Sequence, residues 1–95
     1  MPVTAVPTAQ PSTPEQQPDA IDAQEALIRR AQAVLASGTA ECRDVCLAAG
    51  NICTAASEIC HLAGDGHARC GRARDACTDA SRRRDGACPV CPSAR

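Results

Sequence analysis

The stretch that decides the fold is ECRDVCLAAGNICTAASEICHLAGDGHARCGRARDACTDASRRRDGACPVC, residues 41–91, and its centre is Gly64-Asp65-Gly66. Four cysteines are placed symmetrically about Asp65, in pairs that lie five and twelve residues from it: Cys60 with Cys70, and Cys53 with Cys77. A chain that reverses at Asp65 as two antiparallel helices brings the members of each pair level. We therefore predict a helical hairpin that turns at this tripeptide.

The chain of 95 residues is long enough for one small domain. It contains no Phe, Tyr or Trp, and much of its apolar content is Ala and Cys. Such residues bury little area, so a core of this kind needs covalent or metal cross-links. Eight cysteines in so short a chain are typical of a disulfide scaffold or a thiolate metal protein.

The domain organisation follows from a change in composition near residue 18. Residues 1–18 hold five of the seven prolines, and we expect them to form a disordered tail rich in Pro, Thr and Gln. Residues 19–95 form the cysteine-rich helical domain. We predict an all-α fold of three helices, at about 20–37, 40–63 and 66–85.

The first helix has an apolar stripe but no cysteine. Asp19 is the expected N-cap, because Pro18 would interrupt a helix that begins earlier, and Gly38 suits the left-handed residue after the C-terminus. The stripe consists of positions seven residues apart and their neighbours: Ile21, Ile28 and Leu35, with Leu27 and Val34 beside them.

The second helix, with Thr39 as expected N-cap, carries two parallel lines of side chains. At about 100° per residue, four thiols fall on one side of it: Cys42, Cys46, Cys53 and Cys60. Val45, Ile52 and Ile59 form an adjacent aliphatic line. We expect the thiols to face the third helix and the aliphatic line to receive the first helix. Gly50-Asn51 is the point at which this helix could break.

The third helix, with Asp65 as expected N-cap, has an inner face of Cys and Ala only. Alanines allow two helices to approach closely, within the Cα separation that a disulfide needs. We therefore pair Cys60 with Cys70 and Cys53 with Cys77. For the remaining four cysteines we prefer the nested pairs Cys46–Cys88 and Cys42–Cys91. Symmetry about Asp65 favours Cys42 opposite Cys88 instead, with Pro89 turning the tail toward Cys46.

The alternative to four disulfides is metal binding by free thiolates. Cys42, Cys46, Cys88 and Cys91 supply four sulfurs, and Cys88-Pro-Val-Cys91 resembles the knuckle of zinc ribbons. The row of inward cysteines also resembles the copper-storage helical bundles, in which thiolates hold Cu(I) and four helices are needed. The disulfide interpretation requires no cofactor.

Two further motifs are better explained structurally. Cys88-Pro-Val-Cys91 is similar to a glutaredoxin redox motif, but no βαβ pattern surrounds it, so half of a structural cross-link is the simpler interpretation. His61 and His67 could complete a Cys2His2 zinc site with Cys60 and Cys70. A histidine at a helix C-terminus and another in an exposed first turn need no metal to explain them.

Charge gives no indication of a nucleic-acid or membrane partner. The net charge is −1, and the run Arg82-Arg83-Arg84 suits the C-terminal end of a helix. No aromatic residue is available to stack on a base. Residues 41–63 carry a net charge of −2 and residues 65–86 a net charge of +2, which favours a hairpin. We also expect no transmembrane segment.

The same interval separates two cysteines in each helix of the hairpin, Cys53-x6-Cys60 and Cys70-x6-Cys77. This layout resembles the twin CX9C helical-hairpin proteins and the α-hairpinins. Here the interval is six residues, so the resemblance implies a disulfide-laddered hairpin and no activity. The pattern is also similar to small exported cysteine-rich bacterial proteins, often lipoproteins, that have no assigned function.

We therefore expect a monomeric, non-enzymatic module with a structural or protein-binding role and an unidentified protein partner. No catalytic triad or carboxylate pair can be argued from the spacing. The cysteine content favours an oxidising compartment, so we expect an exported protein, periplasmic, surface-anchored or secreted, whose native signal is not present in this sequence. The alternative function is a thiolate protein for Cu(I) or Zn.

Overall fold

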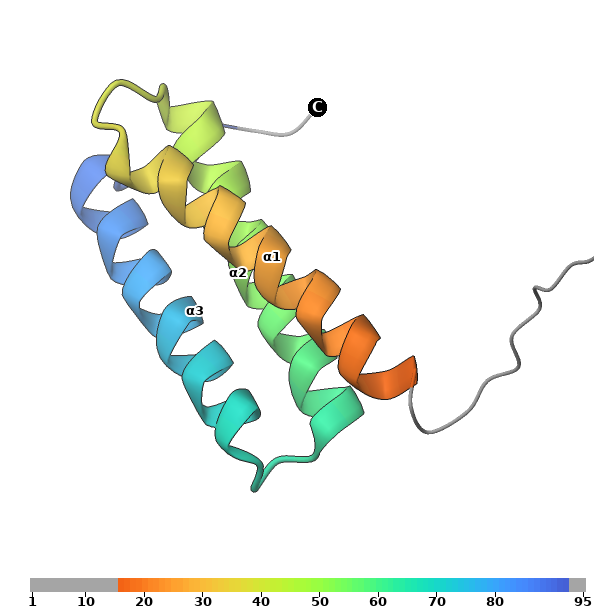
Figure 1. The fold of residues 1–95 in the computed structure, drawn as a ribbon. Helices are drawn as coiled ribbons and strands as arrows, with labels where there is room; N and C mark the ends of the chain where they lie inside the picture. The colour runs from red at the N-terminus through yellow and green to blue at the C-terminus, as the bar shows by residue number, and fades with distance from the viewer. Residues whose placement is uncertain (1–15, 93–95) are drawn as a thin grey trace, which may run out of the picture.

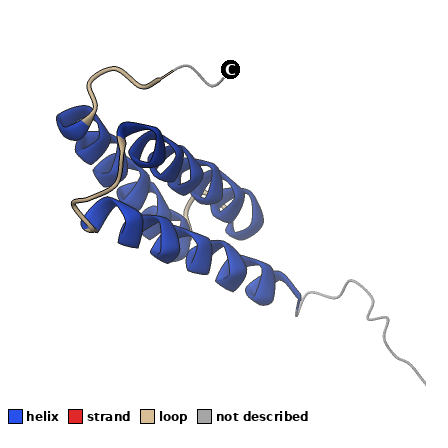
Figure 2. Cartoon of the chain, turned by 90° about the horizontal axis from the view of Figure 1, so that it is seen from above, coloured by secondary structure: helices blue, strands red, loops and turns tan. Residues whose placement is uncertain are grey.

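The computed structural model describes residues 16–92 and contains three helices. They are α1 (Gln16–Ala36), α2 (Cys42–Ala63) and α3 (Ala68–Ala87). The helices run side by side, and each reverses the direction of the one before it (Figures 1 and 2). No strand occurs in the described part of the chain. The predicted all-α, three-helix architecture is confirmed.

The central helix is α2, which packs against both of the others, while α1 and α3 touch each other much less. Its aliphatic line lies at the core, because Ile52 and Ile59 are completely buried and pack with Ile21 and Ile28 of α1. The face of α2 toward α3 is lined by small side chains. Ala49 and Ala56 of α2 are buried, as are Ala73 and Ala80 of α3. Both predicted faces of α2 are thus confirmed.

The chain reverses between α2 and α3 at the predicted tripeptide. Gly64 has φ +98°, and its N–H donates to the carbonyl of Cys60 at 2.9 Å. The N–H of His67 in turn donates to the carbonyl of Gly64 at 3.0 Å. The turn therefore occupies residues 64–67, and α3 can begin only at Ala68.

The N-caps of α2 and α3 differ from the prediction. Glu41, not Thr39, precedes α2 and makes no side-chain cap hydrogen bond. His67, not Asp65, caps α3, and its Nδ1 accepts a hydrogen bond from the N–H of Arg69 at 3.0 Å. Asp65 lies within the turn and forms an exposed ion pair of 3.3 Å with Arg74.

The first helix begins at Gln16, earlier than predicted. Assigning residues 16–18 to the tail, with Asp19 as N-cap, was therefore wrong. Pro18 is the third residue of α1, and a proline is tolerated there because the first N–H groups of a helix have no intrahelical partner. Residues 1–15 of the expected tail lie outside the described residues.

The second helix runs unbroken through Gly50-Asn51. It is also long and apolar enough, by length and composition alone, to cross a membrane. The expectation that the chain has no transmembrane segment therefore stays a prediction. The core helix of a small domain has the same composition, and α2 occupies that position between α1 and α3.

Candidate functional site

The α2–α3 interface carries a ladder of disulfides. Cys60 and Cys70 are bonded with their Cα atoms 4.5 Å apart, and Cys53 and Cys77 with their Cα atoms 4.6 Å apart. Both inner pairs are those predicted from the symmetry about Asp65. The approach is close because alanines separate the cysteines along both helices, so no bulky side chain holds the backbones apart.

The outer pairs differ from the preferred prediction. Cys42 is bonded to Cys88 and Cys46 to Cys91, with Cα separations of 5.5 and 6.0 Å. The nested pairs Cys46–Cys88 and Cys42–Cys91 were wrong. The reason is that α3 does not end before Gly86 but continues to Ala87, which places Cys88 level with the start of α2. The chain then turns at Pro89 and returns along α2, so Cys91 reaches Cys46.

All eight cysteines are therefore oxidised, and none is free. Cys42, Cys46, Cys88 and Cys91 have no thiolate to offer a metal ion in this state. Among residues 16–92 no group of three or more His, Cys, Asp or Glu side chains is arranged to hold a metal. Four disulfides indicate folding in an oxidising setting outside the cytoplasm.

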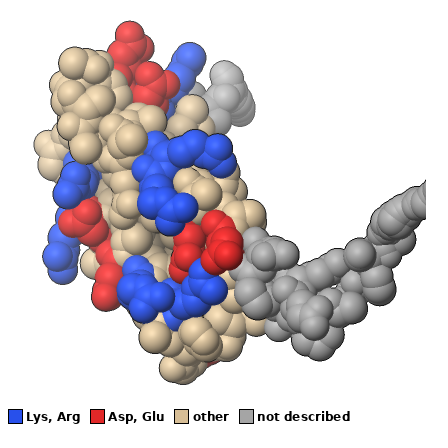
Figure 3. Space-filling view, viewed as in Figure 1, with Lys and Arg blue, Asp and Glu red and all other residues tan. Residues whose placement is uncertain are grey.

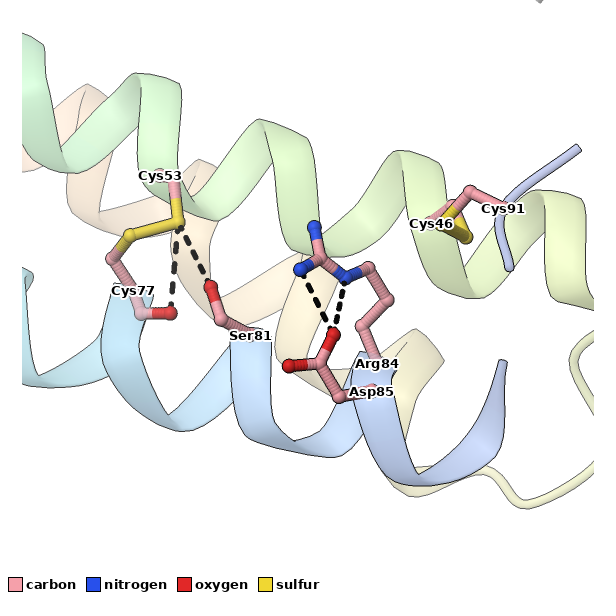
Figure 4. A network of polar contacts seen from close by, with 7 residues as sticks. All are labelled: Cys46, Cys53, Cys77, Ser81, Arg84, Asp85 and Cys91. Carbon is pink, nitrogen blue, oxygen red and sulfur yellow. Dashed lines mark hydrogen bonds and ion pairs between the residues drawn. A yellow bond between two sulfur atoms is a disulfide. The ribbon is translucent and has the colours of Figure 1, made fainter. Parts of the chain in front are cut away.

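A serine of α3 contacts the ladder. Figure 4 shows Ser81 beside the Cys53–Cys77 bond, with its Oγ 3.7 Å from the sulfur of Cys53. A bonded sulfur has no hydrogen, so the serine hydroxyl is the donor of this weak interaction. The carbonyl oxygen of Cys77, 3.5 Å from the same sulfur, is only in contact with it. The same view shows Arg84, one turn further along α3, paired with Asp85 at 3.0 Å.

No disulfide joins the first helix to the hairpin. Arg69 of α3 instead reaches it with its guanidinium, which pairs with Asp22 and, at 2.6 Å, with Glu25. The hydrogen bond from Arg69 and its positive charge hold the pKa of Glu25 below its usual range. The same two carboxylates raise the pKa of Arg69. This contact links residues more than 40 positions apart, so no local spacing in the sequence indicated it.

An apolar groove runs between α1 and α2 and has a volume of about 620 Å³. Three large aliphatic side chains line it while remaining exposed: Leu27 (44 %), Val34 (37 %) and Leu47 (58 %). Among the described residues only one other large aliphatic side chain is exposed to this extent, Val90. The exposed aliphatic surface is therefore concentrated in one place, which is typical of a binding surface.

The groove carries one charge of each sign. Arg30 lines it from α1 and Asp44 from α2. Within residues 16–92 neither side chain belongs to an ion pair. The groove is thus neutral overall, with two charges available to a partner.

Leu27 and Val34 were predicted to lie beside the apolar stripe of the first helix, but the sequence pattern did not separate them from the buried members of that stripe. Leu47 was missed altogether. The signal for Leu47 was present, because it lies on neither the cysteine line nor the aliphatic line of α2. On the face shown in Figure 3, basic and acidic side chains are interspersed among uncharged ones.

The two histidines lie near the α2–α3 turn. His61 is exposed in the last turn of α2, where the helix dipole favours a cation, and His67 caps α3. Cys60 and Cys70 are bonded to each other and supply no thiolate for a Cys2His2 site.

Comparison of the chain with protein-family models, with curated proteins and with solved structures gave no match.

Proposed function

We propose that this chain is a non-enzymatic, exported protein-interaction module, in which four disulfides fix a helical hairpin and the α1–α2 groove receives a protein partner. The observation that carries the proposal is the concentration of exposed aliphatic side chains in that groove. Burying such side chains against a partner is the main favourable term in protein association.

The disulfides support the exported location. Bonds of this kind persist in oxidising compartments and are rare where thiols are kept reduced. They also supply the rigidity that the alanine-lined α2–α3 interface lacks, so the α2 side of the groove is presented on a fixed scaffold. A protein recovered from its native compartment should therefore weigh eight hydrogens less than its reduced form, two for each bond, and resist thiol alkylation.

A position-specific cross-link tests the binding role. A photo-crosslinking amino acid is placed at Leu47, in the groove, and separately at Ser57, which is exposed on α2 outside that groove. In the producing cell we expect position 47 to cross-link to a discrete protein and position 57 not to do so. Equal labelling from both positions, or no protein adduct at position 47, would contradict the proposed function.

The thiolate metal protein is the weaker candidate, because it requires reduction of bonds that the structure shows formed. Uptake of Zn or Cu(I) by the protein as isolated, without added reductant, would favour it over the interaction module.

A further inference from the structure

We propose that the occupant of the α1–α2 groove is the same groove of a second copy, so that α1 and α2 of two chains form an antiparallel four-helix interface. This inference rests on the proposed function, since it names the partner of the same site. It departs from the monomer expected from the sequence. Two independent features of the groove support it: its shape and its charges.

The shape of the groove is self-complementary. A five-residue loop joins the end of α1 at Ala36 to the start of α2 at Cys42, so residues at equal distances from this loop lie level. Leu47 is five residues beyond the start of α2, and Ala31 is five residues before the end of α1. Leu47 is therefore level with Ala31, a small residue. Along α1, Leu27 lies about one turn before Ala31 and Val34 about one turn after it.

A two-fold axis parallel to the helices preserves these levels while placing α1 of one chain over α2 of the other. Leu47 of each copy then inserts between Leu27 and Val34 of its partner, above Ala31. This is the knob-into-hole contact of helical bundles, and every neighbouring pair of helices at the interface runs antiparallel. An isologous contact of this type buries all three exposed aliphatic side chains of both chains at once.

The charges match under the same symmetry. Arg30 lies six residues before the end of α1, and Asp44 lies two residues after the start of α2. The levels of their Cα atoms therefore differ by about 6 Å, a distance that a long arginine side chain spans. Each dimer would contain this pair twice, Arg30 of one copy with Asp44 of the other. Both groove charges would then be paired. A strongly acidic or strongly basic partner would instead repel one of the two.

The test measures the molar mass of the full oxidised chain by sedimentation equilibrium over a wide concentration range. We expect a reversible monomer–dimer equilibrium. Leu47→Glu should weaken dimerisation by at least about a hundredfold, because each dimer would take two buried, unpaired carboxylates. Val90→Glu is the matched control, since Val90 is an exposed aliphatic residue outside the groove, and it should dimerise like the parent.

Charge reversal distinguishes the proposed dimer from unspecific association. Arg30→Asp and Asp44→Arg should each weaken dimerisation, because each places like charges together, and the double variant should restore it. Both positions are exposed, so helicity measured by circular dichroism should stay unchanged.

Three results would overturn the inference: a monomer at every concentration, an equal effect of the Leu47 and Val90 variants, or no recovery in the double reversal. A monomer whose position 47 still cross-links to a different protein would overturn the dimer and leave the proposed function intact. A monomer whose position 47 cross-links to no protein would contradict both the dimer and the proposed function.

Discussion

The Cα atoms of Cys53 and Cys77 lie 4.6 Å apart across the α2–α3 interface, although 24 residues separate them in the sequence. So close an approach of two helices buries alanines rather than large side chains, and Ala56, Ala73 and Ala80 are each at most 4 % exposed. Burial of methyl groups contributes little to stability. The covalent bond, which restricts the unfolded chain, is therefore the principal support of this interface.

The first prediction concerns that bond. Replacing Cys53 and Cys77 together by Ala should lower the melting temperature markedly, because one such cross-link acting alone contributes about 3 kcal/mol and somewhat less when others are nested around it. Arg83→Ala is the control, since the ion pair of Arg83 with Asp79 is exposed and lies within a single helix. Equal melting temperatures for the two variants under oxidising conditions would show that the Cys53–Cys77 bond does not stabilise the hairpin.

The second prediction concerns the outer disulfides. Trypsin cleaves after Arg43 and so separates Cys42 from Cys46, whereas Cys88 and Cys91 stay on one peptide. The disulfide-linked peptides are then fragmented in the mass spectrometer at the backbone between Cys88 and Cys91. The fragments should show Cys42 bonded to Cys88 and Cys46 bonded to Cys91. Detection of Cys46 on Cys88 would instead support the nested pairing.

The difference between inner and outer pairs shows what the sequence could predict. Cys60–Cys70 and Cys53–Cys77 follow from helix geometry and one turn, both of which are local properties. The outer pairs depend on where α3 ends. Gly86 suggested an end that the structure does not have, because the helix continues to Ala87, directly before the Cys88 that is bonded to Cys42. The position of α1 could be predicted only from its apolar face, since no cysteine marks it.

The third prediction concerns the attachment of α1, which carries no disulfide. Arg69→Gln should increase amide hydrogen exchange in α1 and leave α2 and α3 protected, because it removes the pairs with Asp22 and Glu25 while the ladder stays intact. Arg74→Gln is the matched control, since Arg74 lies on the same helix and pairs with the exposed Asp65 in the α2–α3 turn instead of with α1. Uniform exchange changes across all three helices would contradict independent opening of α1.

The fourth prediction concerns acid. The pKa of Glu25 in the folded protein lies below its ordinary value near 4.5, because Arg69 donates a hydrogen bond to the ionised carboxylate and attracts it. A carboxyl with a lowered pKa in the folded state binds fewer protons there than in the unfolded state. The contribution of Glu25 to stability is therefore present above its ordinary pKa and is lost as the pH falls through its pKa in the folded state.

The Glu25–Arg69 pair joins α1 to a hairpin that the disulfides hold by themselves. Acidification below the ordinary pKa should therefore reduce the amide protection of α1 before that of the cross-linked hairpin. Glu25→Gln should show less of this pH dependence, with α1 already less protected at neutral pH. Glu58→Gln is the control, since Glu58 is exposed on α2 and belongs to none of the ion pairs among residues 16–92. If the protection of α1 depends on pH identically in all three proteins, the Arg69–Glu25 pair does not hold this helix on the hairpin.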